Sequence, residues 1–295
     1  MTRVAVIGAG GMGSWFARFF KSRGDSVIVS DSDQRKARRF ASRIGVRSAS
    51  NSIDAVRVSD VVILATPVGA VSDIVKEILP VLRRNTLLFD VCAVKSAVIP
   101  ALRLAERRGV KVASIHPMFG PLARGLRGRL VIVVRDEKDG RGVKDMKRLF
   151  DAARIVTAGP RVHDRQVALT LALPHFLNMV FAMAILRRGS LFGIRKFAGR
   201  TFNLQMLLAE AVASEPETIA DIQIMNKQFG SILRDLERDI RSLAKVLERH
   251  DRAELVARYT KIREHLSVDP EFATAQEAFE RVTDLASQFL RNKTR

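Results

Sequence analysis

The pattern of hydrophobic positions changes character about half-way along the chain. Over the first 160 residues, short apolar runs rich in β-branched side chains alternate with stretches whose apolar residues recur at helical spacing. Because strands and helices alternate and the runs are apolar throughout, the pattern predicts a parallel sheet buried between helices on both faces. The predicted strands cover 4–7, 27–30, 61–65, 86–90, 110–114 and 130–134, and the predicted helices cover 12–22, 34–44, 70–82 and 96–108.

After Pro160 the pattern predicts helices and no strand. Pro216 and Pro270 stand where prolines commonly begin helices. The change marks a domain boundary, so we expect an α/β sheet domain at 1–160 and an all-helical domain at 161–295. The predicted helices of the second domain cover 163–187, 201–214, 216–249, 251–266 and 270–291.

One stretch, residues 167–186, is apolar enough to resemble a membrane span. Its middle carries Pro174, His175 and Asn178, where a bilayer would penalise polar groups. We therefore predict no membrane partner and a helix that is covered by its own domain or by a second copy of the chain. The apolar helices exceed what one small bundle can bury, which favours a homodimer through the helical domain.

Composition and charge narrow the class of protein. Hydrophobic residues make up 47% of the chain, and the single cysteine, Cys92, together with the absence of a signal-peptide pattern predicts a cytoplasmic protein. The net charge is +19, and most of the excess lies in the first 160 residues. Such a surface attracts anions, but one Trp, one Tyr and no recognition motif argue against nucleic acid. Two interpretations of the charge stay open: a solvated basic surface, and a surface that attracts anionic ligands.

A glycine-rich turn follows the first predicted strand. Gly8, Gly10 and Gly13 have the G-x-G-x-x-G spacing, with Gly11 and Met12 between the last two, and a predicted helix begins there. In this context the spacing is typical of dinucleotide binding, because the backbone can approach the pyrophosphate and the helix N-terminus supplies amide donors. These five residues are the predicted phosphate cradle, and the first domain is predicted to be of Rossmann type.

Two further strand ends are expected to border the dinucleotide. Asp31 ends the second predicted strand, where an acidic side chain accepts hydrogen bonds from ribose hydroxyls and repels a 2′-phosphate. This predicts NAD rather than NADP, although Arg35 and Lys36 nearby weaken the preference. Thr66 and Pro67 end another strand at the same edge, and a plain strand-to-helix turn is the alternative interpretation of those two residues.

The candidate catalytic residue is His116, which lies just after a predicted strand in a loop rich in Pro and Gly. A neutral imidazole at that edge can accept a proton from a hydroxyl while hydride leaves the adjoining carbon. No metal site is predicted.

The chain carries His-Pro-Met-Phe-Gly-Pro at 116–121, Asp-Val-x-x-Val-Lys at 90–95, and His163-Asp164 followed by Leu-Pro-His at 173–175. Together with the glycine-rich turn near the N-terminus, these strings resemble the prephenate/arogenate dehydrogenase family. The resemblance covers most of the first 180 residues, and the loop of His116 is its most specific part. It implies an NAD-dependent oxidative decarboxylation in tyrosine biosynthesis. Hydride passes from C4 of prephenate or arogenate, the 4-hydroxyl proton is drawn off, and loss of CO2 gives 4-hydroxyphenylpyruvate or tyrosine.

The resemblance also assigns roles to residues. It implies that His116 hydrogen-bonds the 4-hydroxyl and that His175 lines the substrate pocket, with a structural role as the alternative for His175. Arg200 and Lys95 are the candidates for binding the dicarboxylate substrate, since a guanidinium suits bidentate carboxylate binding; solvated or structural roles are the alternatives.

One position departs from the family, which usually has a serine where this chain has Ala93. Alanine cannot make the hydrogen bonds of that serine to the histidine and the substrate. A water, Ser114 or Ser96 substitutes, or catalysis is weaker, or the substrate differs. Two other functions stay open: a hydroxyacid or imine-type dehydrogenase of the same architecture, and a non-catalytic regulatory protein that binds NAD.

Overall fold

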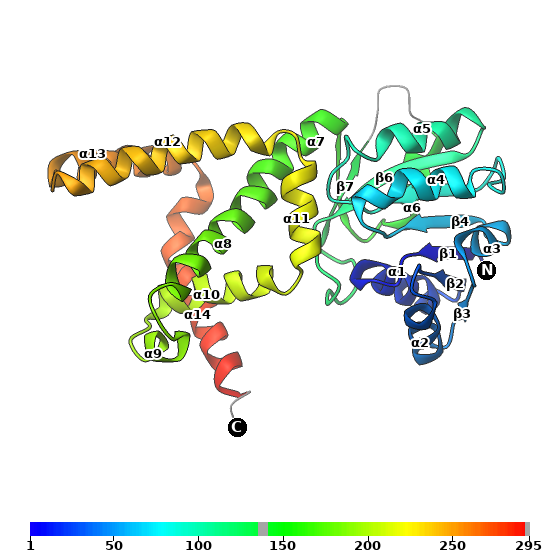
Figure 1. Ribbon diagram of the computed structural model, residues 1–295, viewed down its shortest axis with the longest axis horizontal. Helices are drawn as coiled ribbons and strands as arrows, with labels where there is room; N and C mark the ends of the chain where they lie inside the picture. The colour runs from blue at the N-terminus through cyan, green and yellow to red at the C-terminus, as the bar shows by residue number, and fades with distance from the viewer. Residues whose placement is uncertain (135–140, 293–295) are drawn as a thin grey trace. The chain divides into compact units, whose positions relative to one another are not determined.

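The apolar runs of the first half pair side by side in one eight-stranded sheet, seen in the computed structural model of Figure 1, which describes residues 1–134 and 141–292. The strand order is β3-β2-β1-β4-β5-β6-β7-β8, and all described neighbours are parallel except the antiparallel pair β6 and β7. The Rossmann-type sheet is therefore confirmed, with a reversal that the sequence pattern did not show. The strands are β1 (Arg3–Ile7), β2 (Ser26–Ser30), β3 (Arg47–Ser48), β4 (Val61–Leu64), β5 (Leu87–Asp90), β6 (Lys111–Pro117), β7 (Leu130–Val134) and β8 (Arg154–Ala158).

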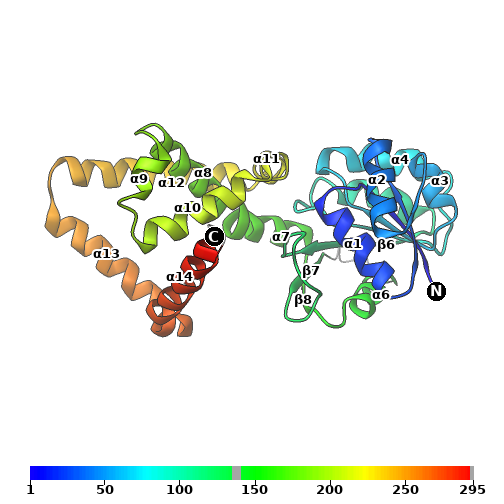
Figure 2. The ribbon, with the colours of Figure 1, turned by 90° about the horizontal axis from the view of Figure 1, so that it is seen from below.

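Helices cover both faces of this sheet, and alternate residues of each central strand point to one face or the other. One face packs against α1 (Gly11–Ser22), α2 (Gln34–Ile44) and α6 (Arg141–Leu149). These three helices are labelled in Figure 2. The other face packs against α3 (Ser52–Arg57), α4 (Val71–Ile78) and α5 (Ile99–Arg107), with the short η1 (Val68–Ala70) before α4. The two buried cores fix the strand ends that carry the site.

The chain divides into two compact units that differ from the predicted domain ranges. The first unit comprises Met1–Ala168 and Ala220–Gln228, and the second comprises Leu169–Ile219 and Phe229–Arg295. Helix α7 (Pro160–Val167) stays with the first unit, as does the end of α11 (Pro216–Met225), whose Met225 packs on the sheet core. Residues 135–140 and 293–295 of the predicted domains lie outside the described residues.

The second unit is helical throughout its described part, as predicted. The predicted single helix over 216–249 is wrong, because the chain leaves helical geometry between α11 and α12, where the Asn226 side chain bonds the backbone of Gln228. The elements are η2 (Ala168–Ala172), α8 (Leu173–Leu186), α9 (Leu191–Arg195), α10 (Arg200–Ala213), α12 (Phe229–Glu248), α13 (Arg252–Leu266), η3 (Pro270–Thr274) and α14 (Ala275–Asn292).

The apolar helix noted in the sequence is continuous from Pro160 to Leu186 and is the one described helix that is long and apolar enough to cross a membrane. Asn178 is buried on it and accepts a hydrogen bond from Gln205 on α10. Many apolar side chains on the same helix, Met183 among them, are exposed in the single chain. The helix is therefore not covered by its own domain, which leaves the second copy of the chain as the predicted cover.

Candidate active site

The predicted site residues of the first unit gather at one edge of the sheet. Strands β1, β2, β4, β5 and β6 run parallel, so their carboxyl ends lie at the same edge. Gly8, Asp31, Thr66, Asp90 and His116 stand at or just after these ends. Ligands of open α/β sheets bind in the crevice outside such ends.

The glycine turn has the geometry that its spacing predicted. Gly8 has a φ of +103°, and a Cβ on it would overlap the carbonyl oxygen of Ala65. A Cβ on Gly13 would overlap the carbonyl oxygen of Gly8, so only glycine lets α1 pack this close to β1. A Cβ on Gly10 would meet nothing within 4 Å. The protein therefore leaves open space beside Gly10, next to the amide-rich start of α1, where a phosphate can bind.

Asp31 is tied to the same turn. Its Oδ2 accepts a hydrogen bond from the backbone N–H of Ala9 at 2.6 Å, and its Oδ1 accepts one from Asp33 at 2.9 Å. The Lys36 ammonium lies 3.7 Å from Oδ2. The backbone thus orients the carboxylate, and each oxygen keeps a lone pair for a ribose hydroxyl.

Thr66 borders Gly8 and carries a buried polar atom without a partner. Its Oγ1 makes no hydrogen bond within the described part of the chain, while its methyl group lies beside Gly8. Buried hydroxyls are nearly always hydrogen-bonded, so this atom indicates a group supplied by a ligand. Pro67 is exposed and precedes η1. The open space at Gly10 and the free Thr66 hydroxyl together fit a dinucleotide.

The loop after His116 is anchored on the helix that follows the glycine turn. The indole N–H of Trp15 donates to the carbonyl of Ala123 at 2.8 Å, and the rings of Trp15 and Phe119 lie 4.9 Å apart. A Cβ on Gly11 would lie 3.0 Å from Pro121. These contacts hold the loop of His116 beside the predicted phosphate cradle.

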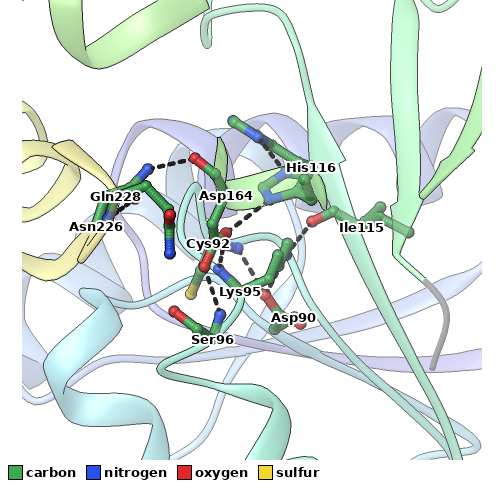
Figure 3. A network of polar contacts seen from close by, with 10 residues as sticks. Asp90, Cys92, Lys95, Ser96, Ile115, His116, Asp164, Asn226 and Gln228 are labelled. Carbon is green, nitrogen blue, oxygen red and sulfur yellow. Dashed lines mark hydrogen bonds and ion pairs between the residues drawn. The ribbon is translucent and has the colours of Figure 1, made fainter. Parts of the chain in front are cut away.

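His116 is buried and bonded to a second histidine (Figure 3). Its Nδ1 lies 3.0 Å from Nε2 of His163 on α7, and Nδ1 of His163 lies 2.8 Å from Oδ1 of Asp164. The backbone N–H groups of Lys95 and Ser96 donate to the two oxygens of Asp164 at 2.9 Å and 2.8 Å. Three segments that are distant in the sequence therefore meet at the His163–Asp164 pair.

Three further contacts, made by two side chains, complete this network. The fully buried Lys95 ammonium donates to Oδ1 of Asp90 and to the carbonyl of Ile115, both at 2.6 Å. The Asn226 amide donates to the carbonyl of Asp164 at 2.8 Å. Lys95 was a candidate for substrate binding, but its ammonium holds the ends of β5 and β6 together, which favours the structural alternative.

Burial sets the protonation states of the network. It lowers the pKa of His116 well below its usual value, and positive charge on His163, when that ring is protonated, and on Lys95 adds to this effect. It also lowers the pKa of His163, although Asp164 opposes the shift. Burial alone would raise the pKa of Asp164, but hydrogen bonds from His163 and Ser96 lower it to about 2. At neutral pH the arrangement therefore holds two neutral imidazoles beside one carboxylate.

Comparison with known proteins assigns both parts of the chain. Residues 16–157 match the model of the prephenate dehydrogenase nucleotide-binding domain, and residues 159–261 match that of the prephenate dehydrogenase dimerization domain. The chain belongs to the prephenate dehydrogenase family.

Individual relatives agree with this assignment. The chain is 27% identical, over 85% of its length, to a probable arogenate/prephenate dehydrogenase of Methanocaldococcus jannaschii, and 22% identical, over 88% of its length, to the T-protein of Haemophilus influenzae. These matches span 58% and 66% of the two relatives. The fold resembles that of Aquifex aeolicus prephenate dehydrogenase in complex with hydroxyphenyl propionate and NAD⁺, with a TM-score of 0.73, 20% identity, and coverage of 91% of this chain and 99% of that chain.

Ala93, the residue at which the family resemblance implies a serine, is half-buried. Of the two candidate substitutes, Ser96 is exposed and donates its backbone N–H to Asp164. The Ser114 hydroxyl is buried and has no hydrogen-bond partner among the described residues. Ser114 therefore stays the better prediction for the missing hydroxyl.

The remaining candidates lie in the second unit, the dimerization domain of the family. His175 is half-buried near the start of α8, and its Nδ1 is buried without a partner among the residues described there. Burial lowers the pKa of His175. Arg200 begins α10, is half-exposed, and pairs with Glu280. Substrate contacts by His175 and Arg200 stay predictions.

His163, Asp164 and Asp90 are the site residues whose roles the sequence did not reveal. The string His163-Asp164 served only as part of a family resemblance, and Asp90 only as a strand end. The sequence did offer two signals. Asp90 is a polar residue at the end of an apolar predicted strand, and the His163-Asp164 pair stands just before an apolar helix. The contact between His116 and His163 joins positions 47 residues apart, which periodicity cannot reveal.

Proposed function

We propose that this protein is an NAD-dependent dehydrogenase that oxidatively decarboxylates prephenate or arogenate. The observation that carries the proposal is the paired His116, held at the carboxyl edge of the sheet beside the glycine turn of a chain that belongs to the prephenate dehydrogenase family. The family assignment decides against a hydroxyacid or imine-type dehydrogenase. A cytoplasmic location remains a prediction.

The chain's own residues prepare the reaction. The amides at the start of α1 and the open space at Gly10 hold the pyrophosphate, and Asp31 binds the ribose. A nicotinamide bound there would supply the acceptor for the hydride of substrate C4. His116 takes the 4-hydroxyl proton as the C4–O bond gains double-bond character. Loss of CO2 then makes the ring aromatic, and His116 returns the proton to the oxygen.

We further propose that the helical unit forms a homodimer and supplies the carboxylate contacts. The exposed apolar side chains of the long helix, such as Met183, and the family's dimerization domain support the dimer. Arg200 would have to exchange Glu280 for a substrate carboxylate, a change that a half-exposed guanidinium can make at little cost.

The test is absorbance at 340 nm with prephenate and arogenate, each supplied with NAD⁺ and with NADP⁺. We expect turnover with at least one substrate and a higher kcat/KM with NAD⁺ than with NADP⁺, because Asp31 repels a 2′-phosphate. No reduced cofactor with either substrate contradicts the proposed activity. A preference for NADP⁺ contradicts the role of Asp31 alone.

A further inference from the structure

The hydrogen bonds of the buried network fix where its protons lie. Asp164 is ionised and can only accept, so Nδ1 of His163 must carry the hydrogen of the 2.8 Å bond. Nε2 of the neutral His163 then has a lone pair, and Nδ1 of His116 must donate to it across 3.0 Å. The nitrogen left to receive a proton on His116 is therefore Nε2.

We propose that His163 is a positioning residue for His116: it fixes the tautomer in which Nε2 is the base, and it links the charge formed on His116 to Asp164. The inference rests on the proposed function and deepens it. A third group that orients a base through its second nitrogen is a recurring device in catalytic sites. Here that third group is an imidazole bonded to a carboxylate.

In the proposed reaction, the hydrogen bond between His116 and His163 would help to hold a proton temporarily. The 4-hydroxyl gives up a proton early and regains it when the ring becomes aromatic, so the reaction releases no net proton. When Nε2 of His116 takes that proton, its Nδ1–H proton can shift to Nε2 of His163. The positive charge then lies beside the Asp164 carboxylate, and the reverse shift restores both imidazoles. No other oxidant or reductant is needed, because the hydride leaves with the nicotinamide.

Among the described residues, three charged groups, Asp164, Lys95 and Asp90, surround the His116–His163 pair. Asp164 faces His163 and favours the protonated form, while Lys95 disfavours it. The Lys95 ammonium is itself paired with Asp90 at 2.6 Å, so its field is partly neutralised. Asp164 is held by two backbone N–H groups, which keeps its carboxylate aimed at His163.

The kinetic test compares His163→Leu with His163→Gln. Leucine fills similar space but cannot accept from His116, so we expect kcat to fall about 100-fold and the acid limb of its pH profile to move to lower pH. Glutamine can accept from His116 and donate to Asp164, so it should recover about tenfold of that loss. The exposed His265→Gln on α13 is the control and should keep wild-type kcat. Equal losses in both His163 variants, with an unmoved acid limb, would overturn the proposal, as would a leucine variant within threefold of wild type.

A second measurement needs no substrate, so it separates this inference from the proposed function. ¹⁵N NMR of histidine-labelled protein, with signals assigned by His116→Asn and His163→Leu, reports the tautomer of each ring. We expect His116 to carry its proton on Nδ1 near pH 7.5 in the wild-type protein and to lose this preference in His163→Leu. A proton on Nε2 of wild-type His116 contradicts the proposal, even if the enzyme turns over.

Discussion

The two units of the chain differ in which side chains they bury and which they expose. The first unit buries a network of ionisable residues and pairs them internally, so that the carboxylate of Asp164 alone receives three hydrogen bonds. The second unit leaves many large apolar side chains exposed. Among them are Leu177, Met179, Met183 and Leu186 on α8, Ile240, Leu243 and Leu247 on α12, and Val256, Tyr259, Ile262 and Leu266 on α13.

The contrast indicates where each unit obtains its stability. A buried ionisable group is tolerated only when it is paired, and the first unit supplies the partners from its own strand ends and from α7. Exposed apolar patches of this extent mark interaction surfaces. The first unit therefore pairs the buried charges of this network with its own residues, whereas the second unit exposes apolar surface of the kind that the proposed homodimer would cover.

The largest expected effect is on the chemistry of the first unit. His116→Asn keeps an N–H donor for His163 but removes the base, so kcat should fall by roughly 10²–10⁴-fold. The affinity for NAD⁺, measured by calorimetry, should stay unchanged because the glycine turn is untouched. Wild-type turnover in this variant would remove His116 from the mechanism.

A charge on the apolar face tests the second unit. Met183→Asp should weaken self-association about 100-fold, because a carboxylate would be buried without a partner at the proposed dimer interface. Sedimentation velocity over a concentration series measures the change. Val58→Asp, at an exposed apolar position of the first unit, is the matched control and should leave association unaltered. If both variants behave alike, the contrast between the units is wrong.

The Asp164 carboxylate makes the stability of the first unit depend on pH. Its pKa is about 2 in the folded chain and near 3.8 in an unfolded one, so it contributes about 2 kcal/mol of stability above pH 4. This contribution disappears as the pH falls through 2. Asp164→Asn should therefore lower the free energy of unfolding by about that amount at pH 7, and the gap to wild type should narrow toward pH 3 in urea titrations. An equal gap at both pH values would contradict the assignment.

Substitutions at Gly10 and Gly13 distinguish an effect on cofactor binding from an effect on folding. Gly10→Ala meets no protein atom, so the fold should stay intact while NAD⁺ affinity falls at least about tenfold. Gly13→Ala overlaps the Gly8 carbonyl and should also destabilise the unit by about 1–3 kcal/mol. Calorimetric binding and thermal denaturation of both variants make the comparison. Wild-type binding by Gly10→Ala would show that the open space is not the phosphate site.

The smallest effect is expected at Ala93, where the family resemblance implies a serine. Ala93→Ser adds the usual hydroxyl at a half-buried position, and kcat should stay level or rise by a few-fold. Loss of activity would show that the site is arranged around alanine.

The sequence predicted those parts of the structure that depend on local pattern. The six apolar runs form strands and the glycine turn has its predicted conformation. Both features depend on residues that are close together in the sequence, so the local pattern reveals them. The two-residue β3 and the edge strand β8, with exposed positions along it, lack that signal. Strand direction is not encoded in an apolar run, so the reversal between β6 and β7 did not show either.

The site was harder to predict because its contacts are long-range. His116 could be singled out from its loop, but its partner His163 comes from a helix that follows the last strand of the sheet. The prediction of one unbroken helix over 216–249 failed for the same reason: at Asn226 the chain leaves helical geometry, and the Asn226 side chain donates to the backbone carbonyl of Asp164. Lys95 carried a charge suited to an anion, and only its burial against Asp90 revealed the structural contact.

The account depends on the position of one nitrogen. A crystal structure of the protein with NAD⁺ and a 4-hydroxyphenyl product analogue measures it directly. We expect Nε2 of His116 about 3 Å from the 4-hydroxyl, with the pyrophosphate over Gly10. A hydroxyl bound elsewhere, with Nε2 of His116 turned into the protein core, would contradict the account.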